Sequence, residues 1–494
     1  MEGEKNVIGI LRETKNYWEC RTPLVPSDAA TLISRGIRVI LQPSSNRCFH
    51  DSEYESVGAS LSEDLSEAGI ILGVKEVLPK HFLPGRIFMF FSHTFKAQAY
   101  NMHMLDSMIA NRITLVDYET IKNPLGTRTV ALGKFGGNSG VLDFFQGLGK
   151  YLLMKLMSNP FLFQGFGYMY RDLKDIRQEL AKIANLIHRD GLPDPVVPMI
   201  WGVVGNGRCS MGVQEMLSLL PHRILTPDQL STLELGPEAK YQIYIVIFQT
   251  NKLYHRKSDG GFDRKEYNDY PNLYESVFFD KYARHLSVIF NCLYYESKYP
   301  RVLNTCHFKH LPKLLGICDI TCDLKGSIEI CRKFTTPEEP FFLYNVHDDR
   351  MYELCKAHIE GSVLYYSMDF LPTELPRDAS SHLSHSLLTY IQELTSADYS
   401  ESLENSGLSS DLISSIHLYK GQLTEKYRYI EELRYKSPIP CENIDEEAAK
   451  LRRILKACPQ LASDIDNSRY GQELTSESKA AIVQIARILR QGVK

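Results

Sequence analysis

Short apolar segments of strand length alternate with helix-like segments over residues 7–118. Strands that are separated by a helix pair in parallel, because the helix carries the chain back across one face of the sheet. We predict helices over Ser27–Ser34 and Lys96–Asn111, and the alternation places the chain in the α/β class. The predicted strands are Val7–Arg12, Arg38–Gln42, Ile70–Val74, Ile87–Phe91 and Thr114–Tyr118.

A second series of strands follows a helical stretch. Residues 139–191 carry Leu and Phe at helical spacing, and Pro193, Pro195 and Pro198 then end the helices. The chain is therefore expected to form two Rossmann-like, doubly wound parallel-sheet domains with a cleft between them, followed by a helical tail. The second set of strands is expected at Met199–Val204, Ile243–Phe248, Ser287–Asn291 and Leu314–Ile320, with a polar insertion over Asn251–Tyr274.

The composition argues against several classes of protein. The 56 basic and 60 acidic residues give a net charge of −4, without the excess of positive charge that nucleic-acid-binding proteins carry. No apolar run approaches the ~20 residues of a membrane helix, and the first residues show no secretory or Arg-rich leader. The 11 cysteines form no Cys-x-x-Cys pair, which is typical of reduced thiols. We expect a cytoplasmic protein, with mitochondria as the alternative, and no nucleic-acid or membrane partner.

A glycine turn follows the first strand of the second series. The strand runs into Gly205-Asn206-Gly207-Arg208, and a helix begins near Ser210. Glycine permits a tight turn and lets backbone N–H groups approach a pyrophosphate at a helix N-terminus. The spacing departs from Gly-x-Gly-x-x-Gly, because four residues separate Gly207 from the next glycine. We interpret the turn as a dinucleotide site, with an ordinary turn as the alternative, and its candidate residues are Gly205, Asn206, Gly207, Arg208, Ser210 and Gly212.

The end of the next strand bears on the choice of cofactor. An NAD-binding unit usually offers Asp or Glu to the ribose hydroxyls about 20 residues after the glycines. Here the strand Arg223–Thr226 ends without an acid, and Asp228 comes two residues late. Because a carboxylate would repel a 2′-phosphate, Thr226 favours NADP over NAD.

Two side chains follow predicted strands of the first domain directly. Lys75 comes after Ile70–Val74, and His93 comes after the strand that ends near Phe91. Parallel sheets bind ligands at the carboxyl ends of their strands, where a desolvated lysine titrates nearer to neutrality and histidine already does. The two residues are candidates for a general acid/base pair. A solvated surface lysine and a structural histidine are the alternatives.

Arg21 and Arg128 lie in loops at the edges of predicted strands. The planar guanidinium group binds carboxylates in a two-pronged geometry, so a dicarboxylic substrate would suit both residues. Surface positions without a ligand are the alternative for each.

Two further patterns are interpreted as structural. Gly133–Gly140 lacks the Gly-Lys-Ser/Thr ending of a phosphate loop and predicts close backbone packing at a helix start. The pairs His307/His310 and His382/His385 have no nearby third ligand, so no catalytic metal is expected.

Several separated motifs together resemble a known enzyme family. The chain resembles the lysine-forming saccharopine dehydrogenases and, more closely, lysine-ketoglutarate reductase, the first half of the bifunctional α-aminoadipic semialdehyde synthases. Alanine dehydrogenase is a more distant relative of the same two-domain plan. The motifs that carry the resemblance are Glu13-Thr-Lys, Glu19-x-Arg21-Thr-Pro-Leu-Val-Pro, Ile71-Leu-Gly-Val-Lys75-Glu76, Phe90-Phe-Ser-His93-Thr-Phe-Lys96-Ala-Gln98, Gly316-Ile-Cys-Asp319 and Leu371-Pro-Thr-Glu-Leu-Pro-Arg.

The resemblance implies an NADPH enzyme that condenses L-lysine with 2-oxoglutarate and reduces the imine to saccharopine. Lys75 and His93 match the family's proton-transfer residues. Glu76 matches an acid that tunes the site, as does Glu119, and Asp319 matches a position beside the nicotinamide ribose. The positions that match substrate contacts are Arg21, Lys96, Gln98, Glu119 and Arg128.

Two departures from the family pattern matter. The lysine-forming relatives place an Asp where this chain has Thr226, which favours NADPH and the catabolic direction. No saccharopine-oxidising domain is recognised after Ser437, so we expect a separate enzyme to take the product. A lysine-forming NAD enzyme and a catalytically silent regulatory homologue are the alternatives, and a homo-oligomer is possible.

These expectations divide the chain into five parts. They are a catalytic and substrate domain over residues 1–138, connecting helices over 139–195, an NAD(P)-binding Rossmann domain over 196–368, helices that return to the first domain over 369–436, and a helical tail over 437–494.

Overall fold

The computed structural model describes residues 4–354 and 360–436, so the tail expected over 437–494 lies outside the described residues. Internal contacts divide the described chain into two units. The first unit comprises residues 4–92 and 108–422, with the gap noted above, and the second comprises residues 93–107 and 423–436. Each unit is described by itself.

The N-terminal sheet of the first unit has the strand order β18-β17-β6-β5-β4-β1-β2-β3. The strands from β6 to β3 pair in parallel, as the alternation of strands and helices predicted. Strands β4, β5 and β6 are buried along their whole length, which explains their unbroken apolar sequences. The strand bounds are β1 Glu4–Ile10, β2 Arg38–Leu41, β3 Ser60–Leu61, β4 Ala68–Leu72, β5 Ile87–Phe90, β6 Thr114–Asp117, β17 Ile416–Tyr419 and β18 Gln422–Leu423.

The second sheet has the order β15-β14-β16-β13-β12-β7-β9-β8. Strands β8, β9, β7, β12, β13 and β16 pair in parallel, whereas β14 runs antiparallel to both β15 and β16. The sheet is therefore mostly parallel, as expected, and it ends in an antiparallel edge, where the short turn after β14 allows only a hairpin with β15. The bounds are β7 Ile200–Val204, β8 His222–Leu225, β9 Ile243–Phe248, β12 Val288–Asn291, β13 Gly316–Asp319, β14 Phe342–Asn345, β15 Arg350–Glu353 and β16 Ser362–Tyr366.

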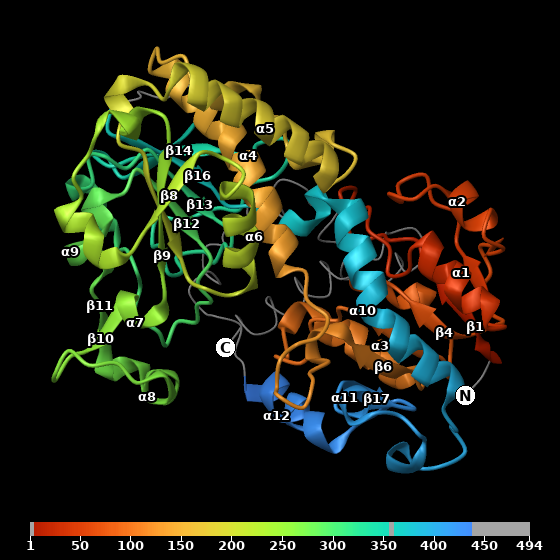
Figure 1. Cartoon of the computed structure of the whole chain (residues 1–494). Helices are drawn as coiled ribbons and strands as arrows, with labels where there is room; N and C mark the ends of the chain where they lie inside the picture. The colour runs from red at the N-terminus through yellow and green to blue at the C-terminus, as the bar shows by residue number, and fades with distance from the viewer. Residues whose placement is uncertain (1–3, 355–359, 437–494) are drawn as a thin grey trace, which may run out of the picture. The chain divides into compact units, whose positions relative to one another are not determined.

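The α/β class with two Rossmann-like sheets is confirmed, and helices join and cover the sheets (Figure 1). The sequence predicted several of these helices, among them α1 and α10. The helix bounds in the first unit are α1 Pro26–Ser34, α2 Asp51–Glu55, α4 Gly133–Met154, α5 Leu173–Asp190, α6 Arg208–Leu217, α7 Thr250–Leu253, α8 Arg264–Asp269, α9 Phe278–Lys281, α10 Pro376–Ser396 and α11 Ser410–Ile413.

Helices α4 and α6 approach each other closely through glycines, and Figure 1 shows them side by side. A Cβ atom on Gly137 would lie 2.0 Å from the carbonyl oxygen of Cys209. A Cβ atom on Gly212 would lie 2.0 Å from the carbonyl oxygen of Lys134. The interpretation of the Gly133–Gly140 cluster as close backbone packing is confirmed. The same contact accounts for the glycine at position 212.

The segment after residue 369 was expected to be helical, and that expectation is corrected in part. Helix α10 is present and buries Ala379, Leu383, Leu387 and Ile391 in the core of the N-terminal sheet. However, the segment also supplies β17, which pairs antiparallel with β6. The Ile-x-Leu alternation in this strand spans four residues, too few to stand out as a strand signal.

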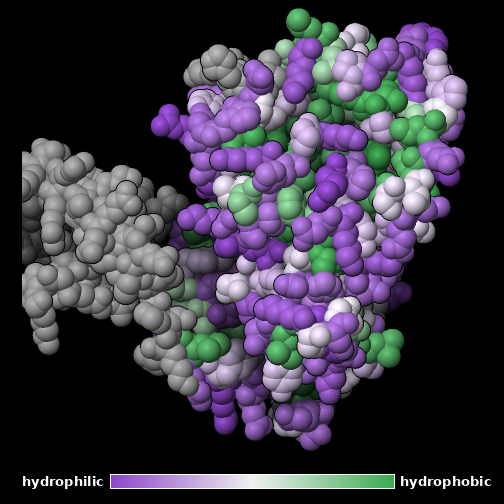
Figure 2. Space-filling view, turned by 90° about the vertical axis from the view of Figure 1, so that its left-hand side faces the viewer, coloured by the Kyte–Doolittle hydropathy of each residue, from purple (hydrophilic) through white to green (hydrophobic). Residues whose placement is uncertain are grey.

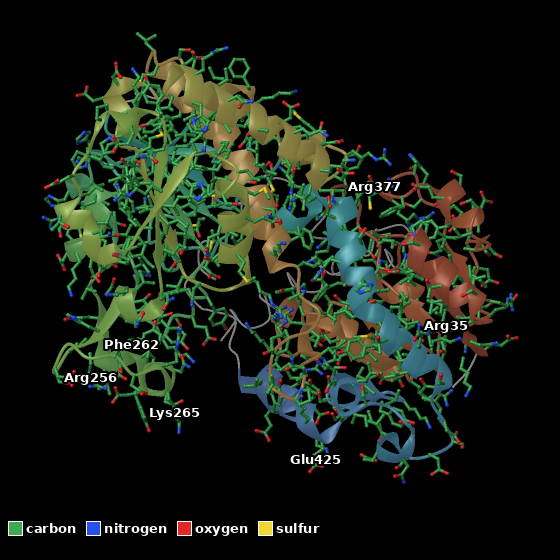
Figure 3. All side chains as sticks on the ribbon, in the orientation of Figure 1. Arg35, Arg256, Phe262, Lys265, Arg377 and Glu425 are labelled. Carbon is green, nitrogen blue, oxygen red and sulfur yellow. The ribbon has the colours of Figure 1, made fainter. Side chains whose placement is uncertain are left out.

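The polar insertion of the second sheet folds around aromatic side chains. Its strands β10 (Tyr254–Arg256) and β11 (Tyr274–Ser276) pair antiparallel, with α8 between them in sequence. The rings of Tyr254 and Tyr267 stack with centroids 5.0 Å apart. Figure 3 labels Arg256, Phe262 and Lys265 in this segment. The aromatic residues thus give the insertion a small core of its own.

The second unit contains most of α3 (Met102–Ala110) and α12 (Tyr429–Lys436). The Tyr429 hydroxyl donates to the Phe95 carbonyl oxygen at 2.8 Å, and Arg434 pairs with Asp106 at 2.8 Å. Across the residues that the structure describes, no helix is long and apolar enough to cross a membrane. The face of the molecule in Figure 2 is mostly hydrophilic, with scattered hydrophobic residues.

Candidate functional site

Charged side chains gather at the carboxyl ends of β1 and β4, which are neighbours in the N-terminal sheet. Glu13, Glu19 and Arg21 belong to the loop after β1, and Lys75 and Glu76 follow β4. The sequence predicted Lys75 and Arg21 for this site. It did not assign a role to Glu13 or Glu19, although both stand in the motifs that carried the resemblance.

Arg21 and Glu19 form a buried ion pair. Arg21 Nε donates to Glu19 Oε1 at 2.7 Å and Nη2 donates to Oε2 at 2.5 Å. Arg21 is 4% exposed and Glu19 is 2% exposed. The two-pronged fork that was expected for a substrate carboxylate is therefore engaged by a carboxylate of the chain itself, two residues away.

The environment of Lys75 lowers the pKa of its amine. Burial is the main cause, because it disfavours the ammonium ion, and the positive charge of Arg21 acts in the same direction. Glu19 and Glu76 oppose the shift. Glu76 Oε1 in turn lies 3.3 Å from Lys15 Nζ. Lys75 is thus a lysine with an increased share of neutral amine near neutral pH.

Glu13 binds the end of β4 rather than another side chain. Its Oε1 accepts the backbone N–H of Val74 at 2.6 Å, and its Oε2 accepts that of Lys75 at 3.1 Å. Burial and the nearby charge of Glu19 raise the pKa of Glu13 to about 7. The sequence signal that could have revealed Glu13 is its position directly after β1. This strand is the neighbour of β4, which precedes Lys75.

Glu119 and Arg128, which were both predicted as substrate contacts, lie next to each other. Arg128 Nη1 is 3.3 Å from Glu119 Oε1. Glu119 Oε2 and Arg128 Nε are buried, and the structure gives neither a hydrogen-bond partner within the described residues. The carbonyl oxygen of Arg128 accepts a hydrogen bond from Arg208 Nη2. This bond joins the predicted substrate residues to the predicted cofactor helix α6.

A buried network that the sequence did not reveal holds the loop after β6. The Asp117 carboxylate accepts hydrogen bonds from the Ser92 hydroxyl and from the backbone N–H of Glu119, the latter at 2.7 Å. His417 Nδ1 lies 3.9 Å from the same carboxylate, and His417 Nε2 lies 3.1 Å from Thr120 Oγ1. His417 comes from β17, some 300 residues away in sequence, so no local pattern could indicate it.

His93, Lys96 and Gln98 belong to the second unit. His93 has a positive φ of 49°, and its carbonyl oxygen accepts from Asn101 Nδ2 at 3.3 Å. Gln98 Oε1 accepts the backbone N–H of Lys96 at 3.2 Å. Lys96 Nζ lies 5.5 Å from the centre of the Phe95 ring. The three predicted residues therefore share one short, turn-rich segment before α3.

The glycine turn combines a backbone conformation that favours glycine with open space before helix α6. Gly205 has a φ of +102°, and a Cβ there would lie 2.9 Å from the carbonyl oxygen of Cys292. A Cβ on Gly207 would meet nothing within 4 Å. Gly207 is the N-cap of α6 and, having no side chain, leaves the N–H groups of the first turn uncapped by the N-cap residue. Uncapped N–H groups beside open space fit the pyrophosphate of a dinucleotide.

Thr226 follows β8 directly and is exposed. Gln229 Oε1 accepts its backbone N–H at 2.8 Å and its hydroxyl at 3.2 Å. The late acid, Asp228, pairs with Lys252 Nζ at 2.9 Å. The end of β8 thus carries a neutral threonine and a carboxylate that a lysine already neutralises.

Asp319 and Ser210, two other predicted cofactor residues, are buried. Asp319 accepts hydrogen bonds from Asn291 Nδ2 and the Tyr365 hydroxyl, both at 2.7 Å, and burial raises its pKa. Ser210 Oγ accepts from Gln214 Nε2 at 2.9 Å. Both side chains are already engaged within the protein.

The fold and these sites define a class of protein. Residues 9–138 match the family model described as alanine dehydrogenase/PNT, N-terminal domain. Among solved structures, an L-alanine dehydrogenase aligns with a TM-score of 0.54 and 16% identity, over 87% of this chain and 99% of that chain. The chain has the two-sheet fold of alanine dehydrogenase, with its N-terminal domain type.

Curated proteins narrow this class. The chain is similar in sequence to the α-aminoadipic semialdehyde synthases. It is 37% identical to the *Arabidopsis thaliana* protein over 454 residues, which is 87% of this chain and 42% of that protein. It is 32% identical to the mitochondrial *Bos taurus* protein over 449 residues, again 87% of this chain and 48% of the relative. The chain therefore spans about half the length of the curated relatives that it matches.

Proposed function

We propose that the chain is a nicotinamide-dependent oxidoreductase, and specifically an NADPH-dependent lysine-ketoglutarate reductase that forms saccharopine from L-lysine and 2-oxoglutarate. The observation that carries the proposal is Lys75, a lysine with a lowered pKa at the carboxyl end of β4, set against the Arg21–Glu19 pair. The homology to α-aminoadipic semialdehyde synthases supports the choice of substrates.

Lys75 would move the protons of the condensation. The ε-amine of the substrate must be neutral to attack the keto carbon, and the carbinolamine then needs an acid to expel water. An amine whose pKa lies nearer neutrality can do both in turn, because each protonation state is populated. The resemblance assigns His93 to the second proton transfer, and we retain that assignment as part of the proposal.

Glu119 and Arg128 would contact the dicarboxylic substrate. The Arg128 guanidinium is bound to Glu119 through one contact of 3.3 Å, and its buried Nε has no partner within the described chain. A substrate carboxylate could satisfy this donor. Lys96 and Gln98 remain further proposed contacts. Arg21 would act through the Glu19 pair and through its effect on the pKa of Lys75.

The glycine turn would hold the dinucleotide, whose nicotinamide supplies the hydride that reduces the imine. Gly205, Asn206, Gly207 and Arg208 would bind the pyrophosphate through the backbone at the start of α6, and Ser210 would support that turn. Thr226 would accept the 2′-phosphate without charge repulsion, and Asp319 would lie on the nicotinamide side. Gly212 is explained by its contact with α4, so we assign it no cofactor contact.

The test is the oxidation of NADPH by the purified chain with L-lysine and 2-oxoglutarate, with saccharopine identified by mass spectrometry. NADPH oxidation that needs both substrates supports the proposal. A preference for NADH, with faster oxidation of saccharopine, would instead indicate a lysine-forming NAD enzyme. No turnover in either direction with either cofactor would indicate a regulatory homologue.

A further inference from the structure

The backbone at the end of β4 is held by a side chain from the neighbouring strand's loop. Glu13 accepts the N–H groups of both Val74 and Lys75, one with each carboxylate oxygen, at 2.6 and 3.1 Å. These two N–H groups precede the side chain of Lys75 and set the direction in which it leaves the sheet. A carboxylate that accepts from two adjacent amides fixes both peptide planes.

We propose that Glu13 is the positioning residue of Lys75: its ionised carboxylate clamps the end of β4 so that the lysine amine is held in its desolvated place. The chemical role of Lys75 rests on the function proposed above, whereas the clamp itself does not. Glu13 contacts no substrate in this proposal and acts only through the backbone of the residue that it holds.

Only the ionised form of Glu13 can make both bonds. A proton on either oxygen would face a backbone N–H with another donor, so one of the two bonds would be lost. Because the pKa of Glu13 is raised to about 7, the clamp should be complete above that pH and should weaken as the pH falls through it. The charged and titratable groups around it are Glu19 and Arg21 from its own loop, Lys75 after β4, and Tyr118 after β6.

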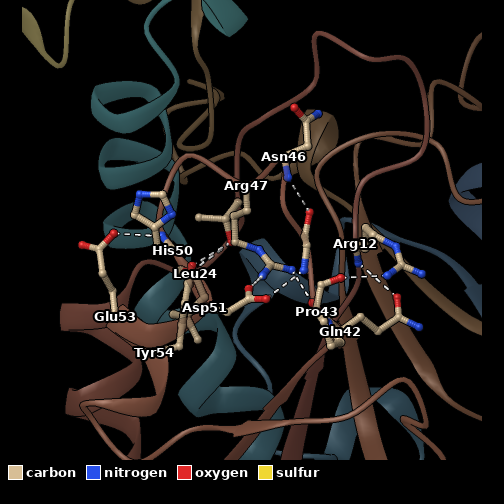
Figure 4. Close-up of polar contacts among 12 residues, drawn as sticks. Arg12, Leu24, Gln42, Pro43, Asn46, Arg47, His50, Asp51, Glu53 and Tyr54 are labelled. Atoms are coloured by element: carbon tan, nitrogen blue, oxygen red, sulfur yellow. Dashed lines mark hydrogen bonds and ion pairs between the residues drawn. The ribbon is translucent and has the colours of Figure 1, made fainter.

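Glu13 is also one of the residues that line a cavity at the surface of the N-terminal sheet's loops. The cavity has a volume of about 560 Å³, and its lining includes Arg12, Glu13, Asn46 and Asp51. Figure 4 shows that polar contacts hold its wall: Arg12 Nη1 donates to the Pro43 carbonyl oxygen at 2.7 Å.

Arg47 contacts two residues at or beside this cavity. Arg47 pairs with Asp51 at 2.7 Å and donates to the Gln42 carbonyl oxygen at 2.8 Å. Both side-chain and backbone acceptors thus hold the residues around the cavity in place.

The direct test measures the amine itself. Each lysine is acetylated briefly over a pH series in the purified chain and in the Glu13→Gln variant, and the labelling is quantified by peptide mass spectrometry. In the wild type, Lys75 should reach half-labelling at a lower pH than the exposed Lys80. In Glu13→Gln the released amine should regain water, and its labelling midpoint should rise by about one pH unit.

A matched control separates this effect from general damage. The exposed Glu63 pairs with Arg12, a residue that lines the same cavity, and Glu63→Gln should leave the Lys75 midpoint unchanged. Glu13→Asp keeps the charge with a shorter reach and should give an intermediate midpoint. An unchanged midpoint in Glu13→Gln, or an equal change in Glu63→Gln, would overturn the proposal.

Kinetics add a second readout. Glu13→Gln should lower kcat by about 10- to 100-fold, leave the Kd for NADPH within about twofold, and remove the loss of rate near pH 7. A rate that still declines near pH 7 in this variant would exclude Glu13 as its source. If the wild type shows no reductase activity, the proposed function fails, and the labelling experiment still decides whether the clamp exists.

Discussion

The two sheets present different chemistry at their carboxyl ends. At the end of β7, the glycine turn offers backbone groups: uncapped N–H groups at the start of α6 beside a glycine with a φ of +102°. At the ends of β1 and β4, the site is built from side chains: Glu19 binds Arg21, and Glu13 binds the backbone N–H groups of Val74 and Lys75. The first site is formed by one continuous segment, and the second needs loops from two neighbouring strands.

Substitutions at the two sites should therefore affect different kinetic and binding properties. A change to a side chain at the N-terminal site should damage turnover and spare the cofactor, whereas a change to the glycine turn should damage cofactor binding first. Variants that alter both properties equally would contradict this division between the two sheets.

The largest effect is expected from Lys75→Met. The change keeps an unbranched side chain but removes the amine, so kcat should fall by ~10²–10⁴ while the Kd for NADPH stays within about twofold. Stopped-flow turnover and fluorescence titration of NADPH would measure the two quantities. Lys80→Met, at an exposed lysine five residues away, is the control and should be close to wild type. Near-normal turnover in Lys75→Met would remove Lys75 from the chemistry.

The next largest effect is expected from Gly205→Ala. The added Cβ would lie 2.9 Å from a carbonyl oxygen, and the positive φ is costly for any residue with a Cβ, by ~1 kcal/mol or more. The Kd for NADPH should rise by about tenfold or more, as measured by fluorescence titration. Gly260→Ala is the control: Gly260 also has a positive φ, of 73°, but it lies in the polar insertion outside the turn, so the Kd for NADPH should stay unchanged. Equal losses in both variants would refute the role given to Gly205.

These two sites also differ in how well the sequence predicted them. The glycine turn was recognisable because the strand, Gly205-x-Gly207 and the helix are consecutive, and periodicity locates such elements well. The strands β1, β2, β4, β5 and β6 were predicted within a few residues for the same reason.

The side-chain site was predicted only in part. Lys75 and Arg21 were identified, but the pairing of Arg21 with Glu19 was not, because which ion partner a buried arginine takes depends on packing. The Asp117–His417 contact could not be predicted from the sequence at all, because it requires β17 to pair with β6 across some 300 residues. Local patterns carry no information about that pairing.

A smaller change is expected at the end of β8. Thr226→Asp would place a carboxylate where the 2′-phosphate of NADPH is proposed to lie, so the ratio of kcat/KM for NADPH over NADH should fall about tenfold, or 1.4 kcal/mol. Steady-state kinetics with both cofactors would measure it. Thr226→Asn is the isosteric, uncharged control and should retain the preference. If the wild type already prefers NADH tenfold, the proposal of NADPH as the cofactor is wrong.

The smallest effect concerns stability and involves two buried carboxyl groups. Asp143 belongs to α4, Glu374 comes just before α10, and both bind the same short backbone segment. Glu374 accepts the backbone N–H of Tyr168 at 3.2 Å, and Asp143 accepts that of Gly167 at 2.8 Å. Burial and the charge of Asp143 raise the pKa of Glu374 above its usual value of 4.5. Between that value and the raised pKa, the unfolded chain loses its proton more readily than the folded one. This carboxyl group therefore lowers the stability of the fold as the pH rises through that window.

Glu374→Gln removes this pH dependence, because the amide stays neutral in both states and its oxygen can still accept from Tyr168. We expect the Tm at pH 8 to rise by about 1 °C, the shift that ~1 kcal/mol produces in a unit of roughly 400 residues. At pH 5, where much less of the penalty applies, the variant and the wild type should melt much closer together. The exposed Glu338→Gln should change neither value. An equal shift at both pH values would mean that packing of the amide, and not the ionisation of Glu374, accounts for the change.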